Sequence, residues 1–236
     1  MKSGSLYLIP TNLTEPVNPG AILPQDVIAV ALRLDHFIAE NAKTARAFLK
    51  SLGIGRPLAE ISIRELNEHT APDALTALLE PLFAGHDVGL VSEAGAPGVA
   101  DPGATIVALA HRHKISVMPL VGPSSILLGL MASGLNGQKF AFHGYLPQEK
   151  QARIAAIREL ESESRRRNMT QLFIETPYRN APLLADLLAT LAPATRLCVV
   201  SDLTGPHERV TMQTVAEWRK ATVDIDRIPA LFLLLA

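Results

Sequence analysis

The most informative stretch of the chain is residues 88–103, which read Val-Gly-Leu-Val-Ser-Glu-Ala-Gly-Ala-Pro-Gly-Val-Ala-Asp-Pro-Gly. The first four residues predict a short buried strand, because a parallel strand covered on both faces is a continuous aliphatic run. The remaining residues carry three glycines and several alanines, so a ligand can approach their backbone closely. Ligands of open α/β sheets bind at the carboxyl ends of strands. Residues 92–103 are therefore either a ligand-binding loop or a long structural connection.

Two further loops are predicted at the same edge of the sheet. Residues 10–15 follow a strand over Leu6–Ile9, and residues 121–125 (Val-Gly-Pro-Ser-Ser) follow a strand over Ile115–Leu120. Serines at a helix start cap free N–H groups, and the same groups can instead hold a ligand carboxylate. Three loops that converge at one edge favour a pocket more than any one of them alone.

The whole chain predicts an α/β protein. Short aliphatic runs alternate with alanine- and leucine-rich helical stretches, which is the pattern of α/β architecture. Aromatic residues make up only 5% of the 236 residues, so aliphatic side chains must fill the core. A strand, a glycine and a proline at residues 140–147 mark a domain boundary. We expect an N-terminal α/β domain over residues 1–139 and a C-terminal α/β domain over residues 140–236.

Composition and spacing exclude several classes of site. One cysteine, Cys198, leaves no disulfide framework or multi-thiolate zinc site, and its apolar neighbours predict a buried strand residue. The seven histidines show no metal-ligand spacing, so no metal is expected. The loop at 92–103 is neither the dinucleotide fingerprint nor a phosphate loop, and no nucleophile elbow is present.

The charge pattern and the chain ends bear on partners and location. A net charge of −1 lacks the strong basic excess of a dedicated nucleic-acid binder. Arg165, Arg166 and Arg167 form either a phosphate contact or a solvated helix end. The first residues lack an apolar signal core, and the final run at 228–236 is too short to span a bilayer. These features predict a cytoplasmic protein without a membrane partner.

Six motifs in order resemble those of the tetrapyrrole methylase superfamily. The likeness is strongest to the bacterial family that methylates a cytidine 2′-hydroxyl in small-subunit ribosomal RNA. The loop Ser92-Glu93-Ala94-Gly95-Ala96-Pro97 with Asp101-Pro102-Gly103 resembles that family's "S-D-A-G-T-P" and "S-D-P-G". The other five motifs are Asn67-Glu68, Val121-Gly122-Pro123-Ser124, Gly144-Tyr145-Leu146-Pro147, Glu175-Thr176-Pro177-Tyr178-Arg179, and Leu203-Thr204 with His207-Glu208. The resemblance covers nearly the whole chain.

The resemblance implies a homodimer that binds S-adenosylmethionine in a cleft between two α/β domains. By that likeness Glu40 and Glu175 act on the substrate side, and Glu93 and Asp101 are further acids near the cleft. The residues implied to bind the cofactor are Pro10, Asn12, Ala94, Gly95, Ala96, Val99, Ser124, Ser125, Leu146, Pro229 and Ala230.

Three departures from the family pattern leave more than one methyl acceptor to consider. The first loop lacks the glycine of "T-P-I-G-N-L-x-D", and Glu40-Asn41-Ala42-Lys43 stands where the family has "E-D-T-R". The sequence also ends directly after the last predicted strand, where the ribosomal enzymes continue into a helical segment. The leading hypothesis is a methyltransferase of ribosomal RNA. The alternatives are a methyltransferase of a small molecule or protein, and a non-catalytic cofactor-binding scaffold.

Overall fold

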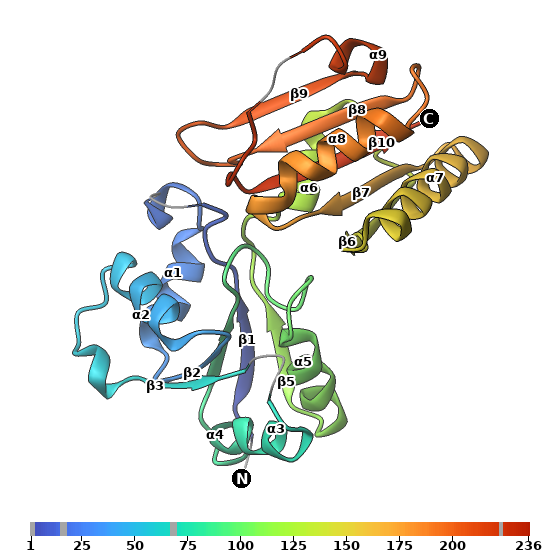
Figure 1. Cartoon of the computed structure of the whole chain (residues 1–236). Coiled ribbons are helices and arrows are strands. Elements are labelled where there is room, and N and C mark those ends of the chain that lie inside the picture. The colour runs from blue at the N-terminus through green and yellow to red at the C-terminus, as the bar shows by residue number, and fades with distance from the viewer. Residues whose placement is uncertain (1–2, 15–17, 67–69, 222–223) are drawn as a thin grey trace. The chain divides into compact units, whose positions relative to one another are not determined.

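The computed structural model describes residues 3–14, 18–66, 70–221 and 224–236. The chain forms two compact units, Met1–Ser124 and Ser125–Ala236, and each contains its own five-stranded sheet (Figure 1). The predicted α/β class with two α/β domains is confirmed. The units divide earlier in the chain than the predicted boundary at 139/140, which itself stays a prediction.

The first unit is built on a parallel sheet. Its strand order is β3-β2-β4-β1-β5, and every neighbouring pair is parallel. The strand bounds are β1 Ser5–Ile9, β2 His36–Ala39, β3 Ser62–Glu65, β4 Val88–Val91 and β5 Ser116–Pro119. Strand β4 is buried along its whole length, as its aliphatic run predicted. Strands β2 and β3 were not predicted.

Helices cover both faces of this sheet. One face packs against α1 (Gln25–Arg33) and α2 (Ala42–Ser51) around Val27, Phe37 and Phe48. The other packs against α3 (Pro72–Leu78), α4 (Glu80–Phe83) and α5 (Gly103–Arg112) around Leu82, Leu90 and Ile106. A turn at Leu79 separates α3 from α4. Two 3-10 helices, Pro19–Ala21 and Leu58–Glu60, complete the unit.

The second unit has a mixed sheet in the order β6-β7-β10-β8-β9. Only the β6–β7 pair is parallel among these neighbours. The strand bounds are β6 Phe140–Tyr145, β7 Thr170–Ile174, β8 Arg196–Ser201, β9 Arg209–Thr214 and β10 Ala230–Leu235. Cys198 is buried in β8, as predicted, and burial raises the pKa of its thiol to about 12. It is therefore a core residue and not a nucleophile.

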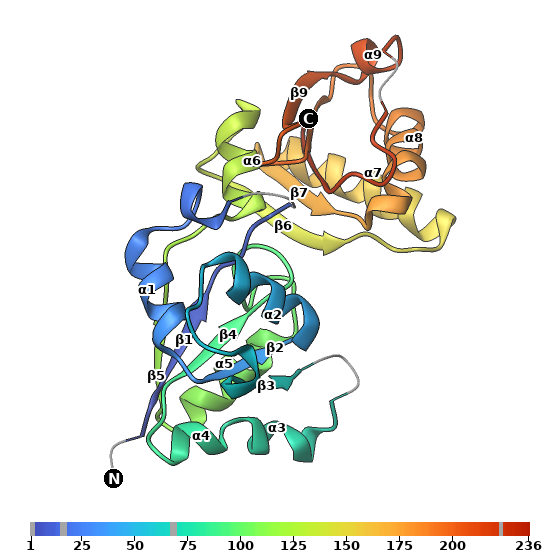
Figure 2. The same ribbon diagram turned by 90° about the vertical axis from the view of Figure 1, so that its left-hand side faces the viewer.

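Helices also cover both faces of the second sheet (Figure 2). Phe173, Val199 and Phe232 share a core with side chains of α7 (Lys150–Arg167) and α8 (Asn180–Thr190). Trp218, from α9 (Val215–Trp218), belongs to the same core, and the 3-10 helix Pro177–Arg179 precedes α8.

Helix α6 (Ser125–Ser133) packs on β10 and β9 from the opposite face. A side chain at Gly129 would come within 2.3 Å of Leu231 Cδ2, so glycine permits this close packing. These contacts place α6 with the second sheet. No helix among the described residues is long and apolar enough to cross a membrane.

Candidate active site

The three predicted loops of the first unit meet at the carboxyl edge of its sheet. Thr11 N–H donates to Gly95 O at 2.9 Å, so the loop after β1 is tied to the loop after β4. A Cβ at Gly122 would lie 2.3 Å from Pro10 Cβ, so the loop after β5 touches the first loop directly. A Cβ at Gly95 would meet Leu13 at 2.9 Å and Pro123 O at 3.4 Å. The predicted convergence of these loops is confirmed.

The loop at 92–103 is stabilised by its own polar groups. The Asp101 carboxylate accepts hydrogen bonds from Gly98 N at 2.8 Å and Gly103 N at 2.7 Å. Burial raises the pKa of Asp101, and these two N–H bonds oppose that rise. Gly95 and Gly98 adopt φ of 72° and 82°, which glycine accepts without strain. The Asp101 carboxylate therefore holds the loop in shape.

Glu40 lies at the end of β2, close to two other acids. Its pKa is raised, first by burial and then by the negative charge of Asp101. A hydrogen bond from the Glu93 backbone lowers the pKa, and the Glu93 carboxylate raises it. A carboxylate with a raised pKa is a better proton acceptor than an ordinary one. Burial and the neighbouring acids thus favour the protonated form of Glu40 more than they would for an ordinary carboxyl group.

The helix after Glu40 begins with a side-chain cap. Asn41 Oδ1 accepts from Lys43 N at 2.8 Å and from Thr44 N at 3.4 Å. Asparagine caps a helix about as well as aspartate. The amide that departs from the family's "E-D-T-R" motif therefore keeps α2 starting at Ala42.

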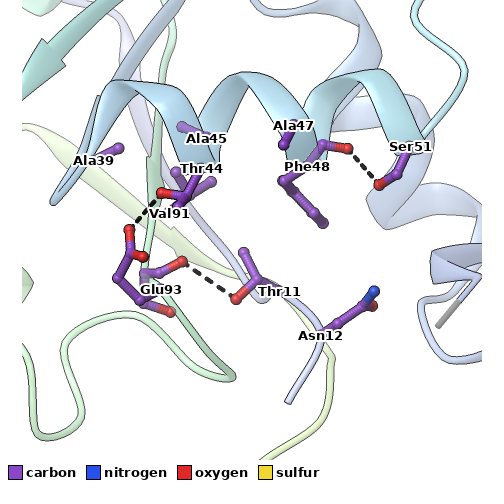
Figure 3. Close-up of a pocket in the computed structure, with 11 residues that line it drawn as sticks. Thr11, Asn12, Ala39, Thr44, Ala45, Ala47, Phe48, Ser51, Val91 and Glu93 are labelled. Carbon is purple, nitrogen blue, oxygen red and sulfur yellow. Dashed lines mark hydrogen bonds between the residues drawn. The ribbon is translucent and has the colours of Figure 1, made fainter. Parts of the chain in front are cut away.

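A pocket of about 470 Å³ opens between α2, the end of β2 and the loops after β1 and β4 (Figure 3). This volume is within the range of small-molecule sites. The Thr44 hydroxyl lies 2.6 Å from Glu93 Oε1, and the two side chains point toward each other. The eleven residues that line the pocket are Thr11, Asn12, Ala39, Thr44, Ala45, Ala47, Phe48, Ser51, Val91, Ser92 and Glu93.

The part of this pocket that α2 supplies was not predicted from the sequence. Thr44, Ala47, Phe48 and Ser51 were not among the predicted site residues. Their spacing of three and four residues places them on one face of a helix. A prediction of β2 as a strand would have identified these residues, because a helix that follows a parallel strand begins at the ligand-binding edge of the sheet.

The predicted cofactor residues of the first unit lie in or beside the converging loops. Pro10 and Asn12 belong to the loop after β1, and Ser124 follows the loop after β5. In the loop after β4, Gly95 is buried, Ala96 is half-buried, and Ala94 and Val99 are exposed. Ala94 and Val99 therefore present small, apolar surface to a ligand.

The remaining predicted cofactor residues lie in the second unit. Ser125 begins α6, and Ala230 begins β10. Leu146 is buried in the core with Ile157 and Phe173, so only its backbone is available to a ligand. Pro229 O accepts a hydrogen bond from Asp202 N at 3.0 Å. The cleft between domains implied by the resemblance stays a prediction.

Glu175 is engaged within the second unit. The side chain is 1% exposed, and Oε1 accepts from Arg179 Nε at 2.9 Å and from Thr176 N at 2.7 Å. This geometry fixes the Arg179 guanidinium. Two predicted motif segments, Asn67-Glu68 and Glu15, lie outside the described residues.

The profile of the family described as Tetrapyrrole (Corrin/Porphyrin) Methylases matches residues 25–218. The chain belongs to this family. It is similar to the Ribosomal RNA small subunit methyltransferase I of Escherichia coli O157:H7, with 30% identity over 214 residues, 91% of this chain and 70% of that protein. The protein of the same name from Mycobacterium bovis is 35% identical over 219 residues, 92% of this chain and 72% of that protein.

Solved structures of this family share the fold. The methyltransferase CobJ is 17% identical with a TM-score of 0.65, over 99% of this chain and 94% of that one. The uroporphyrin-III-C-methyltransferase of Thermus thermophilus is 18% identical with a TM-score of 0.57, over 100% of this chain and 93% of that one. This family member is an S-adenosylmethionine-dependent methyltransferase.

The residues at the converging loops suit this cofactor. Gly95 and Gly98 adopt positive φ and have no side chain to cover their backbone. The exposed Ala94 and Val99 offer apolar contacts.

Proposed function

We propose that this methyltransferase acts on small-subunit ribosomal RNA and methylates a ribose 2′-hydroxyl. The observation that carries the proposal is the identity of 30–35% to proteins named Ribosomal RNA small subunit methyltransferase I, over about nine-tenths of the chain. The pocket beside the cofactor loops supports it, because its walls carry hydroxyl and carboxylate groups next to apolar ones. A nucleoside presents matching hydroxyl groups and a flat base.

We propose that the cofactor binds at the loops after β1, β4 and β5. The backbone of residues 94–96 and the Val99 side chain would contact the cofactor, and Pro10, Asn12 and Ser124 lie at the same carboxyl edge of the sheet. From the second unit, Ser125, Leu146, Pro229 and Ala230 contribute as the family likeness implies. When bound, the cofactor supplies a methyl group on a positively charged sulfur, and the protein supplies orientation and electrostatics.

Glu40 is the proposed general base. Its raised pKa and its place next to Ala39, which lines the pocket, support this role. Glu40 would accept the proton of the acceptor hydroxyl as the methyl group passes from the cofactor sulfur, whose bond to it breaks, to the hydroxyl oxygen. Glu175 is a positioning residue on the substrate side, because it acts through the Arg179 side chain that it holds.

We also propose that the chain is a homodimer. In the second unit, Leu127 and Met131 of α6 are 55% and 79% exposed, and Met212 of β9 is 42% exposed. Apolar side chains gathered on one surface are typical of protein interfaces. Light scattering at several concentrations measures the mass, and a value near 25.4 kDa would contradict this proposal.

Methyl transfer from labelled S-adenosylmethionine tests the function. The acceptors are small ribosomal subunits from an Escherichia coli strain that lacks its own relative, and their naked RNA. We expect one 2′-O-methylated nucleoside by mass spectrometry. If the label appears only in protein or only in small molecules, that class contains the methyl acceptor and the RNA proposal is wrong. No transfer to any fraction of a cell extract, although S-adenosylhomocysteine binds, would favour the scaffold alternative.

A further inference from the structure

The pocket lined by α2 lies beside the predicted cofactor loops and shares little of its lining with them. It spans the carboxyl ends of β2, β4 and β1, whereas the converging loops span those of β4, β1 and β5. Of the predicted cofactor residues, only Asn12 is among those that line it. The pocket therefore offers space for a second ligand next to the first.

The chemistry of the pocket walls selects an uncharged group with hydrogen-bond donors. None of the eleven lining residues is Lys, Arg or His, and Glu93 contributes a carboxylate. Phosphate is repelled by such a site. Hydroxyls on Thr44 and Ser51 accept or donate, and the Phe48 side chain and the alanines provide apolar contact for a flat ring. Ribose with its base fits this description.

A row of cations runs along the solvent side of the same helix. Lys43, Arg46 and Lys50 are exposed, and their spacing of three and four residues places them on one face of α2. Among the described residues, no carboxylate lies within ion-pair distance of these three. Lys43 is in the first turn, where the helix dipole disfavours a cation. Helix stability therefore does not explain a lysine at position 43.

The other arginine cluster differs from this row. Arg167 lies 3.2 Å from Glu163 and Arg165 lies 4.0 Å from Glu161, both one helical turn back on α7. Acids already neutralise those cations, and their position at the helix C-terminus is favoured by the dipole. The sequence allowed either a phosphate contact or a solvated helix end for residues 165–167, and these ion pairs support the solvated helix end.

We propose that α2 is the RNA-docking helix of this enzyme, an inference that rests on the proposed function. The pocket receives the target nucleoside turned out of its strand, and Lys43, Arg46 and Lys50 hold the flanking phosphates. Glu93 accepts a hydrogen bond from the nucleoside, and the Thr44 hydroxyl holds the Glu93 carboxylate in place. Enzymes that modify a nucleotide extrude it into a pocket, and phosphate contacts fix the strand.

The phosphate contacts are tested by the salt dependence of RNA binding. The probe is naked small-subunit ribosomal RNA, and the variant is Lys43→Gln/Arg46→Gln/Lys50→Gln. Each phosphate contact to a single strand contributes about −0.7 to the slope of log K against log salt, so the slope should become shallower by about 2. The control removes three cations from α7, as Arg165→Gln/Arg166→Gln/Arg167→Gln. An unchanged slope in the α2 variant, or a larger change in the α7 control, would overturn the proposal.

The nucleoside pocket is tested by filling it. Ala47 is exposed and lines the pocket, so Ala47→Phe blocks the space without disturbing the core. We expect the KM for RNA to rise about tenfold or more, with unchanged affinity for S-adenosylhomocysteine and an unchanged melting temperature. An equal loss of S-adenosylhomocysteine affinity would assign the pocket to the cofactor instead.

A separate conservative variant tests Glu93. Thr44→Val keeps the shape of the side chain and removes the hydroxyl beside Glu93, so kcat/KM for RNA should fall while S-adenosylhomocysteine affinity stays the same. Normal methylation by all these variants would reject the docking helix and leave the proposed function intact. No RNA binding or methylation by the unaltered chain would reject both.

Discussion

Gly122 is the position where a single added methyl group should disturb the proposed cofactor loops most. In Gly122→Ala the new Cβ would lie 2.3 Å from Pro10 Cβ and 2.6 Å from Pro10 Cγ. The Pro10 ring would have to move by about 1 Å to restore an ordinary contact of 3.4 Å. Because that ring is part of the main chain, the movement carries Thr11, whose N–H donates to Gly95 O at 2.9 Å. The strain therefore reaches the loop after β4.

The expected size of this effect follows from known costs of overpacking. Added methyl groups in packed sites cost about 1–3 kcal/mol. If the strain is released by loosening the loops, S-adenosylhomocysteine affinity falls by about 5- to 150-fold, since 1.4 kcal/mol corresponds to a factor of ten. Titration calorimetry measures the affinity, and circular dichroism measures the melting temperature of the same samples.

A matched control separates loop strain from a general effect of alanine. Gly55 is in the same unit, and a Cβ there would have nothing within 4 Å. Gly55→Ala should therefore bind S-adenosylhomocysteine as the unaltered chain does. If Gly122→Ala also binds it normally, the contact between Pro10 and the loop after β5 does not shape the cofactor site, and the reasoning is refuted.

Three further substitutions test charge and hydrogen bonding. Glu40→Gln should raise the melting temperature at pH 7.5 and abolish methylation. Because the folded pKa of Glu40 is raised, ionisation destabilises the native state as pH rises above the ordinary value of 4.5, so the gain should vanish in melts at pH 4. Arg153→Met leaves the buried Asp186 carboxylate without its 2.5 Å partner and should cost about 3–5 kcal/mol in urea unfolding, against at most about 1 for the exposed Arg167→Met. Trp218→Phe removes a buried 2.8 Å hydrogen bond and should cost about 1–3 kcal/mol, and an unchanged urea midpoint would contradict this.

The loop sequence alone was enough to predict the carboxyl edge of the first sheet as the place for a ligand. Small residues over 92–103 and a buried aliphatic strand before them are local features, and local features can be read from sequence. The same applies to Cys198, whose apolar neighbours predicted burial. Motif order along the chain was likewise sufficient to predict the family.

Strand β2 was missed because its four residues, His36–Ala39, are too few to show a period. The neighbours β3 and β4 make it a strand, since they supply hydrogen bonds along both of its edges. Because β2 was not predicted, the residues of α2 that line the pocket were not predicted either.

The place of α6 was also decided by tertiary structure. Its sequence, Ser-Ile-Leu-Leu-Gly-Leu-Met-Ala-Ser, is apolar on nearly every side, so no stripe indicates which sheet it covers. Gly129 settles the choice physically, because the backbone can approach Leu231 of β10 only where no Cβ intervenes. The sequence by itself thus determined the family, the α/β class and the edge of the first sheet where the loops converge, since these depend on neighbours along the chain. The partners of β2, α2 and α6 depend on residues far away in sequence, and only packing in three dimensions selects them.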